Sequence, residues 1–271
     1  MNREIDHRAR QDGGRRGISV PILMYHQVTP WPLPEFRKYA VTTDAFAAQL
    51  DWLALHNYVA ISMDALYQYR AGRGTLPPRP VVLTFDDGYR DCLEHAVPIL
   101  NARGFTATFY VLGQLAGKTS RWLIAERGIE LPLLDWDAVR ALRAAGHECG
   151  SHGMSHSRLT QLTPATCREE LVASRRMLED ELGEEIRHLA YPFGDYDESV
   201  RAIAAESGYR TACSVRLGWS APDDDLLALH RLHVQGEASL KDFADAFRRH
   251  RSPRQLLKAG VQALRRKLGS R

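Results

Sequence analysis

The sequence contains few cysteines and no long apolar run, and these absences exclude several classes of protein. Its four cysteines, at positions 92, 149, 167 and 213, include no C-x-x-C pair. They therefore imply neither a zinc ribbon nor a disulfide framework, and they fit a reducing compartment. No stretch approaches the roughly 20 apolar residues of a membrane span, and residues 1–17 lack the apolar segment of a signal peptide. We therefore expect a cytoplasmic protein.

Acidic residues are absent from the C-terminal segment. Residues 248–271 hold nine Lys and Arg and no Asp or Glu, within a chain whose net charge is +3. Over 252–271, an apolar stripe is formed by Leu257, Val261, Leu264 and Leu268. Such a basic amphipathic helix either docks on the folded domain or lies peripherally on an anionic membrane. Because no aromatic residue lies among these charges, we expect no binding of nucleic acid.

A strand that ends in two adjacent carboxylates is the most informative stretch of the sequence. The run from Val81 to Phe85 is rich in β-branched and aromatic residues, which is typical of a buried strand. Asp86, Asp87 and Gly88 follow it. Two like charges side by side are costly unless a cation neutralises one or one stays protonated. The pair therefore suggests a metal ligand beside a general base, with a helix cap and chain turn as the alternative.

A pair of histidines could supply further ligands for the same metal ion. His152 and His156 are four residues apart, a spacing that on a helical turn would place both imidazoles on one face. With a carboxylate from elsewhere, they would make a two-histidine, one-carboxylate site with open positions for water and substrate. Such a pair alone also fits a surface or core position. Its presence in one domain with the Asp-Asp strand end favours the metal site.

Predicted strands and helices alternate along the chain, as a parallel barrel requires. We expect a distorted (β/α) barrel of seven or eight units over residues 19–251, between a disordered tail, 1–18, and the basic helix, 252–271. The motifs should then meet at the carboxyl-terminal mouth of the barrel. The irregular stretch 112–134 is a candidate wall of a substrate site, because long loops in compact domains are usually functional or mobile.

Three motifs make the sequence resemble the polysaccharide deacetylase family, the NodB-homology carbohydrate esterases. They are Thr84 to Gly88, His152 to His156 and Leu189 to Gly194, in the order of the family, and the resemblance covers roughly residues 20–234. The resemblance implies metal-dependent hydrolysis of N-acetyl or O-acetyl groups of a carbohydrate. The expected substrate is an oligo- or polysaccharide that contains N-acetylhexosamine, or its lipid-linked precursor. Two alternatives are a cyclic ureide or imide hydrolase of the same superfamily and a degenerate sugar-binding module.

The resemblance also assigns roles to the motif residues. It makes Asp87, His152 and His156 the metal ligands and Asp86 the general base. Zinc is the expected metal, although nickel or cobalt would suit two imidazoles and a carboxylate as well.

Aromatic residues complete the expected substrate and oxyanion site. The Pro-aromatic-Gly motif makes the backbone N–H of Phe193 the oxyanion donor, beside Tyr191 and Pro192. Trp136 is a further candidate for the sugar site. Packing of the barrel is the alternative for Tyr191 and Phe193, and a place in the core is the alternative for Trp136.

The resemblance also implies a general acid, and the sequence departs from the family pattern at two positions. The stretch from Leu23 to His26 matches the Met-Tyr-His strand of the subgroup that deacetylates poly-N-acetylglucosamine, which makes His26 the expected acid. The alternatives, His233 and then His230, lie on a later hydrophobic strand. At the departures, Gly153 replaces a Ser or Thr, and Ala190 replaces the Arg that orients the catalytic Asp in the family.

Overall fold

Short apolar strands alternate with helices over residues 17–249, the part of the chain that the computed structural model describes. The predicted C-terminal helix, 252–271, and most of the predicted tail, 1–18, lie outside these residues. None of the helices in the described part combines the length and hydropathy needed to cross a bilayer.

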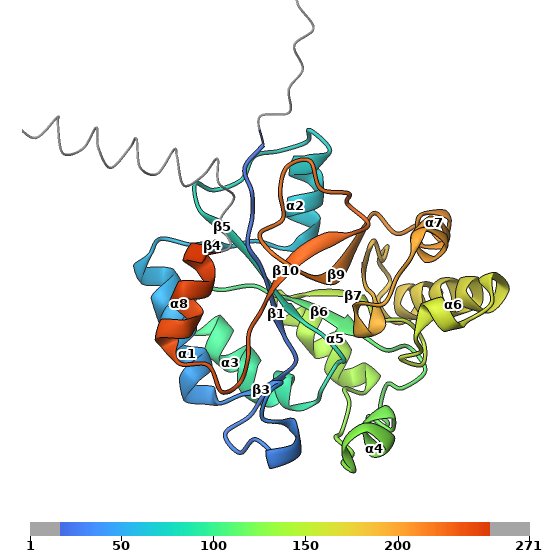
Figure 1. Cartoon of the computed structure of the whole chain (residues 1–271), viewed down its shortest axis with the longest axis horizontal. Helices are drawn as coiled ribbons and strands as arrows, with labels where there is room; N and C mark the ends of the chain where they lie inside the picture. Colours follow the sequence, from blue (N-terminus) through green and yellow to red (C-terminus); the bar gives the residue numbers. More distant parts are fainter. Residues whose placement is uncertain (1–16, 250–271) are drawn as a thin grey trace, which may run out of the picture.

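Parallel strands close into the predicted barrel at the centre of the fold (Figure 1). In order around the barrel, the strands are β1 (Ile22–Tyr25), β10 (Leu229–His233), β9 (Thr211–Leu217), β8 (His188–Ala190), β7 (Glu148–Ser151), β6 (Thr108–Val111) and β5 (Pro80–Phe85). Pairing of β5 with β1, where Tyr25 lies opposite Phe85, closes the ring. β4 (Val59–Ala60) pairs with the first residues of β5, and β2 (Gln27–Val28) pairs with β3 (Ala40–Val41). The expected (β/α) barrel of seven or eight units is confirmed.

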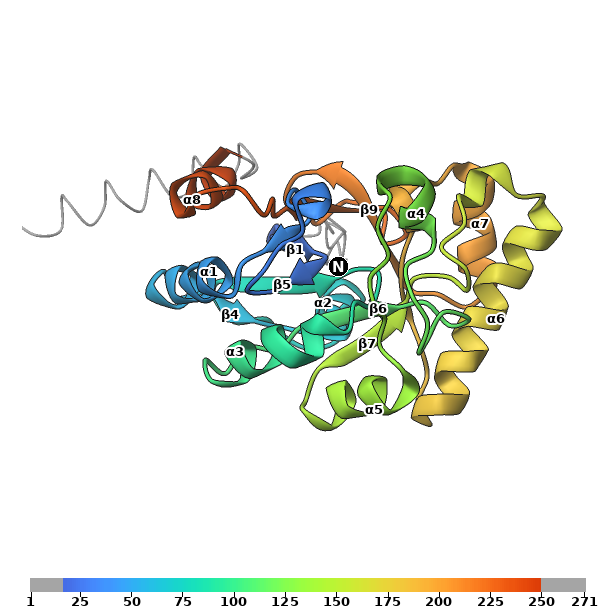
Figure 2. The same cartoon turned by 90° about the horizontal axis from the view of Figure 1, so that it is seen from below.

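Helices surround this barrel (Figures 1 and 2). They are α1 (Thr43–Leu55), α2 (Met63–Arg70), a π-helical turn (Cys92–Ala96) continued by α3 (Val97–Asn101), α4 (Trp122–Arg127), α5 (Trp136–Ala144), α6 (Pro164–Leu182), α7 (Glu198–Glu206) and α8 (Leu240–Arg249). Short 3-10 turns lie at Pro34–Phe36, Leu159–Gln161 and Pro192–Gly194. The stretch 112–134, expected to be irregular, contains α4. Figure 2 shows α8 beside α1, where Trp52 and Phe247 place their ring centroids 5.3 Å apart.

The alternation of side chains along the strands decides which residues reach the barrel interior. Val82 of β5 and Leu229 of β10 belong to one buried cluster inside the ring. Two residues further along each strand, Thr84 and Arg231 are hydrogen-bonded to each other, 3.1 Å from Nη1 to Oγ1. Asp86 directly follows β5 and continues this alternation, so it points inward at the carboxyl-terminal mouth.

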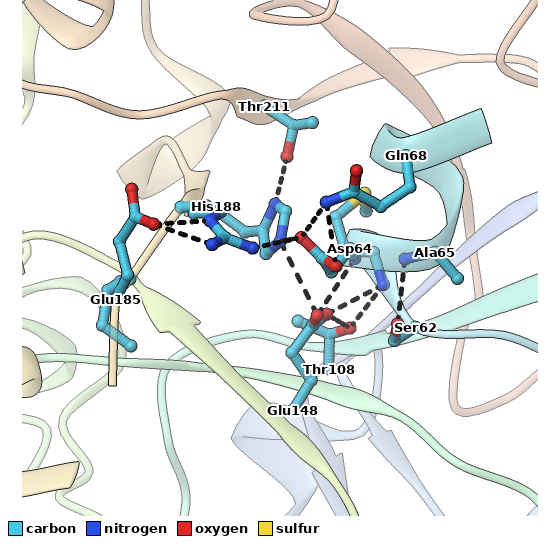
Figure 3. A network of polar contacts seen from close by, with 12 residues as sticks. Ser62, Asp64, Ala65, Gln68, Thr108, Glu148, Glu185, His188 and Thr211 are labelled. Atoms are coloured by element: carbon cyan, nitrogen blue, oxygen red, sulfur yellow. Dashed lines mark hydrogen bonds and ion pairs between the residues drawn. The ribbon is translucent and has the colours of Figure 1, made fainter. Parts of the chain in front are cut away.

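A polar network closes the opposite, amino-terminal end of the barrel (Figure 3). The Glu148 carboxylate accepts hydrogen bonds from the backbone N–H groups of Met63, at 2.8 Å, and of Asp64, at 3.0 Å. Backbone N–H groups at the start of a helix lack intrahelical partners, and that of Met63 also donates to Oγ1 of Thr108 at 3.3 Å. His188 lies between the carboxylates of Glu148 and Asp64, with Nε2 3.6 Å from each. The network therefore attaches α2 to the first residues of β7 and β8.

We predict that Asp64→Asn destabilises the protein in a pH-dependent way. His188, and after it Arg187, hold the pKa of the Asp64 carboxyl below its ordinary value, against the opposing effect of partial burial. Such a carboxyl stabilises the folded state above its unfolded pKa and loses this contribution as the pH falls through its folded pKa. Urea unfolding at pH 7 should show a loss of up to about 1 kcal/mol for this partly exposed group. The loss should shrink as the pH falls below about 4.

The matched control is Asp44→Asn. Asp44 occupies the same place in the first turn of α1, but it is exposed and none of the ion pairs found over residues 17–249 includes it. An equal loss for the two variants, or a loss for Asp64→Asn that is unchanged at pH 3, would contradict the role given to His188.

Candidate metal centre and active site

Three potential metal ligands converge at the mouth of the barrel. Oδ1 of Asp87 lies 3.1 Å from Nε2 of His152 and 3.2 Å from Nε2 of His156. All three side chains are buried, and one ligand atom from each lies within 4.8 Å of the others. The donor set of two imidazoles and one carboxylate suits a divalent transition metal such as zinc. The predicted ligands are therefore brought together as a possible metal site.

The surroundings orient both histidine rings, and for His152 they favour metal ligation by Nε2. Nδ1 of His152 donates a hydrogen bond to the carbonyl oxygen of Ala190 at 2.8 Å, which leaves the lone pair of Nε2 directed at the site. The ring of His156 is held between Trp122 and Phe193, at centroid distances of 4.2 and 4.4 Å. Both rings are thus oriented by groups outside the metal site.

Unusual backbone conformations turn these residues toward one another. Asp87 has φ +71° and His156 has φ +61°, both in the left-handed region that few residues other than glycine adopt. Strand alternation would otherwise point Asp87 away from the interior that Asp86 faces. The expectation of a helical turn from His152 to His156 is wrong, because this segment is a loop after β7. His156, at the end of this loop, has a left-handed backbone conformation.

The electrostatics of Asp87 suit a metal ligand. Burial alone would raise the pKa of its carboxyl, but the neighbouring imidazoles of His152 and His156 outweigh burial and hold the pKa well below its ordinary value. The carboxylate is therefore ionised at neutral pH. Burial lowers the pKa of His156, which favours the neutral form that a metal ligand needs. Burial would also lower the pKa of His152, but the carboxylates of Asp87 and Asp86 outweigh it and raise this pKa.

Asp86 has a separate partner, Arg231, which the sequence interpretation missed. Nη1 and Nη2 of Arg231 donate to the two carboxylate oxygens of Asp86, both at 2.7 Å. Arg231 is completely buried and also donates through Nε to the carbonyl oxygen of Ser214. Burial would raise the pKa of Asp86, but Arg231 outweighs this effect and lowers it.

This pair explains how the chain tolerates alanine at position 190. Ala190 lies on β8 and supplies no side chain that could hold Asp86, whereas Arg231 reaches Asp86 from β10. A signal was present in the sequence, because Arg231 is a charged residue two positions after the apolar Leu229 and so shares the inward face of its strand.

A cavity of about 390 Å³ extends from this centre, and two histidines line it as general-acid candidates. His26 follows β1 directly, and the pairing of Tyr25 with Phe85 places it next to Asp86. His233 ends β10, and its Nε2 is buried without a hydrogen-bond partner over residues 17–249. His230 instead contacts Asp224, 2.8 Å from its Nδ1, and does not line the cavity.

The aromatic candidates divide into two groups. Tyr191 and Phe193 line the cavity, and Phe193 has φ +58° within the 3-10 turn that follows β8. Pro192, the first residue of this turn, is buried and does not line the cavity. The assignment of Trp136 to the sugar site is wrong: as the first residue of α5 it packs against the hydrophobic core. Trp122 of α4 is the tryptophan that lines the cavity.

Comparisons with known proteins agree with this geometry. The sequence model of the polysaccharide deacetylase family matches residues 73–212 of this chain. YxkH of Bacillus subtilis (strain 168) is 25% identical over 215 residues, which are 79% of this chain and 71% of that protein. The poly-beta-1,6-N-acetyl-D-glucosamine N-deacetylase of Staphylococcus aureus (strain MRSA252) is 22% identical over 213 residues, 75% of this chain and 71% of that protein.

Solved structures are similar over most of the barrel. The Streptococcus pyogenes deacetylase PplD in complex with acetate has a TM-score of 0.73 and 25% identity, and the match covers 87% of this chain and 99% of that one. IcaB from Ammonifex degensii has a TM-score of 0.72 and 25% identity, with coverage of 85% and 97%.

We predict that Arg231→Met strongly destabilises the protein, because it leaves the Asp86 carboxylate buried without its cation. The expected loss in the free energy of unfolding is about 3 to 5 kcal/mol, the usual cost of breaking a buried ion pair from one side. The double variant Asp86→Asn/Arg231→Met removes both charges and should be more stable than Arg231→Met alone. Urea unfolding of the four proteins of this cycle measures the coupling.

The control for this cycle is Arg103→Met. Arg103 also makes a two-pronged contact with an aspartate, Asp51, at 2.7 and 3.1 Å, but this pair is exposed. Its loss should cost far less than the loss of Arg231. Equal losses in the free energy of unfolding for the two arginine variants would show that the buried Asp86 carboxylate does not need Arg231 as a partner.

Proposed function

Because the chain belongs to the polysaccharide deacetylase family, we propose that it is a metal-dependent hydrolase that removes N-acetyl groups from a glycan containing N-acetylhexosamine. One observation carries this proposal: the triad of Asp87, His152 and His156 shares a cavity with a second, separately held carboxylate, Asp86. A ligand set beside an ionised base is what hydrolysis of an amide by water needs. The glycan would be an oligo- or polysaccharide, or a lipid-linked precursor.

The roles of the residues follow from their positions. Asp87, His152 and His156 would hold zinc, which when bound polarises the acetyl carbonyl and lowers the pKa of water. Asp86 accepts the proton of the attacking water, and Arg231 keeps this carboxylate oriented and ionised at neutral pH. The backbone N–H of Phe193 lies in the first turn of its 3-10 helix, where such groups lack intrahelical partners. It donates to the oxyanion that forms on the acetyl group.

His26 gives a proton to the leaving amine. It continues the inward row of β1, lies beside Asp86 and lines the cavity. Burial lowers the pKa of its imidazole, while the charges of Asp87 and Asp86 oppose this effect. His233 is the second candidate for the same step.

The function is tested by acetate release from chitooligosaccharides, with allantoin opening measured in parallel and with chelator as a control. We expect acetate release that chelator abolishes and zinc restores, and no opening of allantoin. Asp86→Asn should retain zinc and lower kcat by about 10² to 10⁴, the usual worth of a positioned base. His152→Ala should lose zinc and activity together, whereas His95→Ala, outside the cavity, should keep both.

Other outcomes would contradict the proposal. Full zinc occupancy in His152→Ala would remove this residue from the metal centre. Opening of allantoin without acetate release would favour the cyclic ureide hydrolase. Sugar binding without turnover of either compound would indicate a binding module.

We predict that His26→Ala impairs turnover more than His233→Ala, and that His230→Ala has little effect because His230 lies outside the cavity. In the variant that lacks the true acid, the alkaline limb of the pH–rate profile should disappear. The measurement is kcat against pH for the three variants. If His233→Ala is the more impaired and loses the alkaline limb, then His233 is the acid.

A further inference from the structure

Basic side chains surround the outer part of the cavity. Lys38, Arg127 and Arg158 line it, and Glu126 is the acidic residue that lines it besides Asp86 and Asp87. Over residues 17–249, no ion pair links any of these three basic residues to a carboxylate. Cations without carboxylate partners in a partly enclosed space attract an anion.

Two of these cations gather around Tyr39 on the wall next to His26. Cζ of Arg127 lies 4.8 Å from the centroid of the Tyr39 ring, and Nζ of Lys38 lies 5.5 Å from it. Nη1 of Arg127 donates to the carbonyl oxygen of Glu35 at 3.3 Å, whereas its Nε is buried and has no hydrogen-bond partner in the described part of the chain. The ring of Tyr39 in turn contacts that of His26, with centroids 5.2 Å apart. This wall therefore holds an unsatisfied cationic donor close to the proposed acid.

The third cation lies against another wall of the cavity. Cζ of Arg158 is 3.9 Å from the centroid of Phe193, whose ring also contacts the metal-ligand candidate His156. A guanidinium that stacks through its flat face keeps its in-plane N–H groups available for an oxyanion. Arg158 is exposed and makes no side-chain hydrogen bond among residues 17–249. Cations thus flank the reaction centre from two sides.

We propose that the substrate carries an oxyanion, a phosphate or a carboxylate, on or directly beside the acetylated sugar, and that Arg127 with Lys38, and Arg158, bind it. This inference rests on the proposed function and specifies its substrate class. A neutral chitin-like chain would leave these cations unpaired. The amine released by deacetylation is itself cationic, so the same side chains disfavour a polyamine product and favour substrates that keep a negative group.

The test compares three compounds that share N-acetylglucosamine: its neutral methyl glycoside, its 1-phosphate, and a disaccharide in which glucuronate is attached to it. Calorimetry with the zinc-loaded full chain measures binding, and acetate release is followed separately. One or both anionic compounds should bind about tenfold or more tightly than the neutral one, the worth of a charge-assisted hydrogen bond. This preference should weaken as salt screens the charges.

Arg127→Met and Arg158→Met should each reduce binding of the preferred anionic compound about tenfold, while binding of the neutral glycoside stays within about twofold. The control is Arg121→Met, because Arg121 precedes the same helix α4 but does not line the cavity. It should behave like the unsubstituted protein. The phosphate and carboxylate arms decide which oxyanion the site prefers.

The outcomes separate this inference from the proposed function. Anion-dependent binding that needs Arg127 or Arg158 but leads to no acetate release supports the anion site and contradicts deacetylation. Equal binding and equal deacetylation of all three compounds, unchanged in both variants, overturns the anion site and leaves deacetylation standing. Absence of binding for all three compounds, with acetate still released from chitooligosaccharides, overturns the anion site alone.

Discussion

The burial of two adjacent carboxylates at the end of one strand is the constraint on which the rest of the structure depends. Asp86 is 3% exposed and Asp87 is 6% exposed, so neither can rely on water to stabilise its charge. The chain gives each carboxylate its own partners: Arg231 for Asp86, and the imidazoles of His152 and His156 for Asp87. This separation allows neighbouring residues of one type to hold different roles.

Barrel geometry supplies these partners. Alternation along β5 and β10 brings Asp86 and Arg231 to the same interior, and the left-handed backbone of Asp87 turns the second carboxylate toward the loop after β7. The polar network of Glu148 and His188 occupies the opposite end of the barrel. The amino-terminal end of the barrel thus contributes to stability, whereas the carboxyl-terminal end holds the candidate active site, as in other parallel barrels.

Residue types and spacing were enough to predict the barrel, the convergence of the Asp-Asp strand end with His152 and His156, and the position of His26 at the barrel mouth, because these follow from strand ends that share one mouth. The partner of Asp86 could not be found in this way, since it depends on which strands face each other across the closed ring. Likewise, spacing alone could not show that the segment ending at His156 is a loop. Trp136 and Trp122 are equally plausible in the sequence, and only packing shows that Trp136 joins the core while Trp122 lines the cavity.

The central claim is that Asp87, and not Asp86, binds the metal together with the two histidines. Anomalous diffraction at the zinc edge, from crystals grown with zinc, tests it most directly. We predict one peak about 2.0 to 2.2 Å from a carboxylate oxygen of Asp87 and from Nε2 of His152 and His156. Asp86 should still be paired with Arg231 in those crystals. A peak bound by Asp86, or a cavity without a peak, would show that Asp87 and the two histidines do not form the metal site.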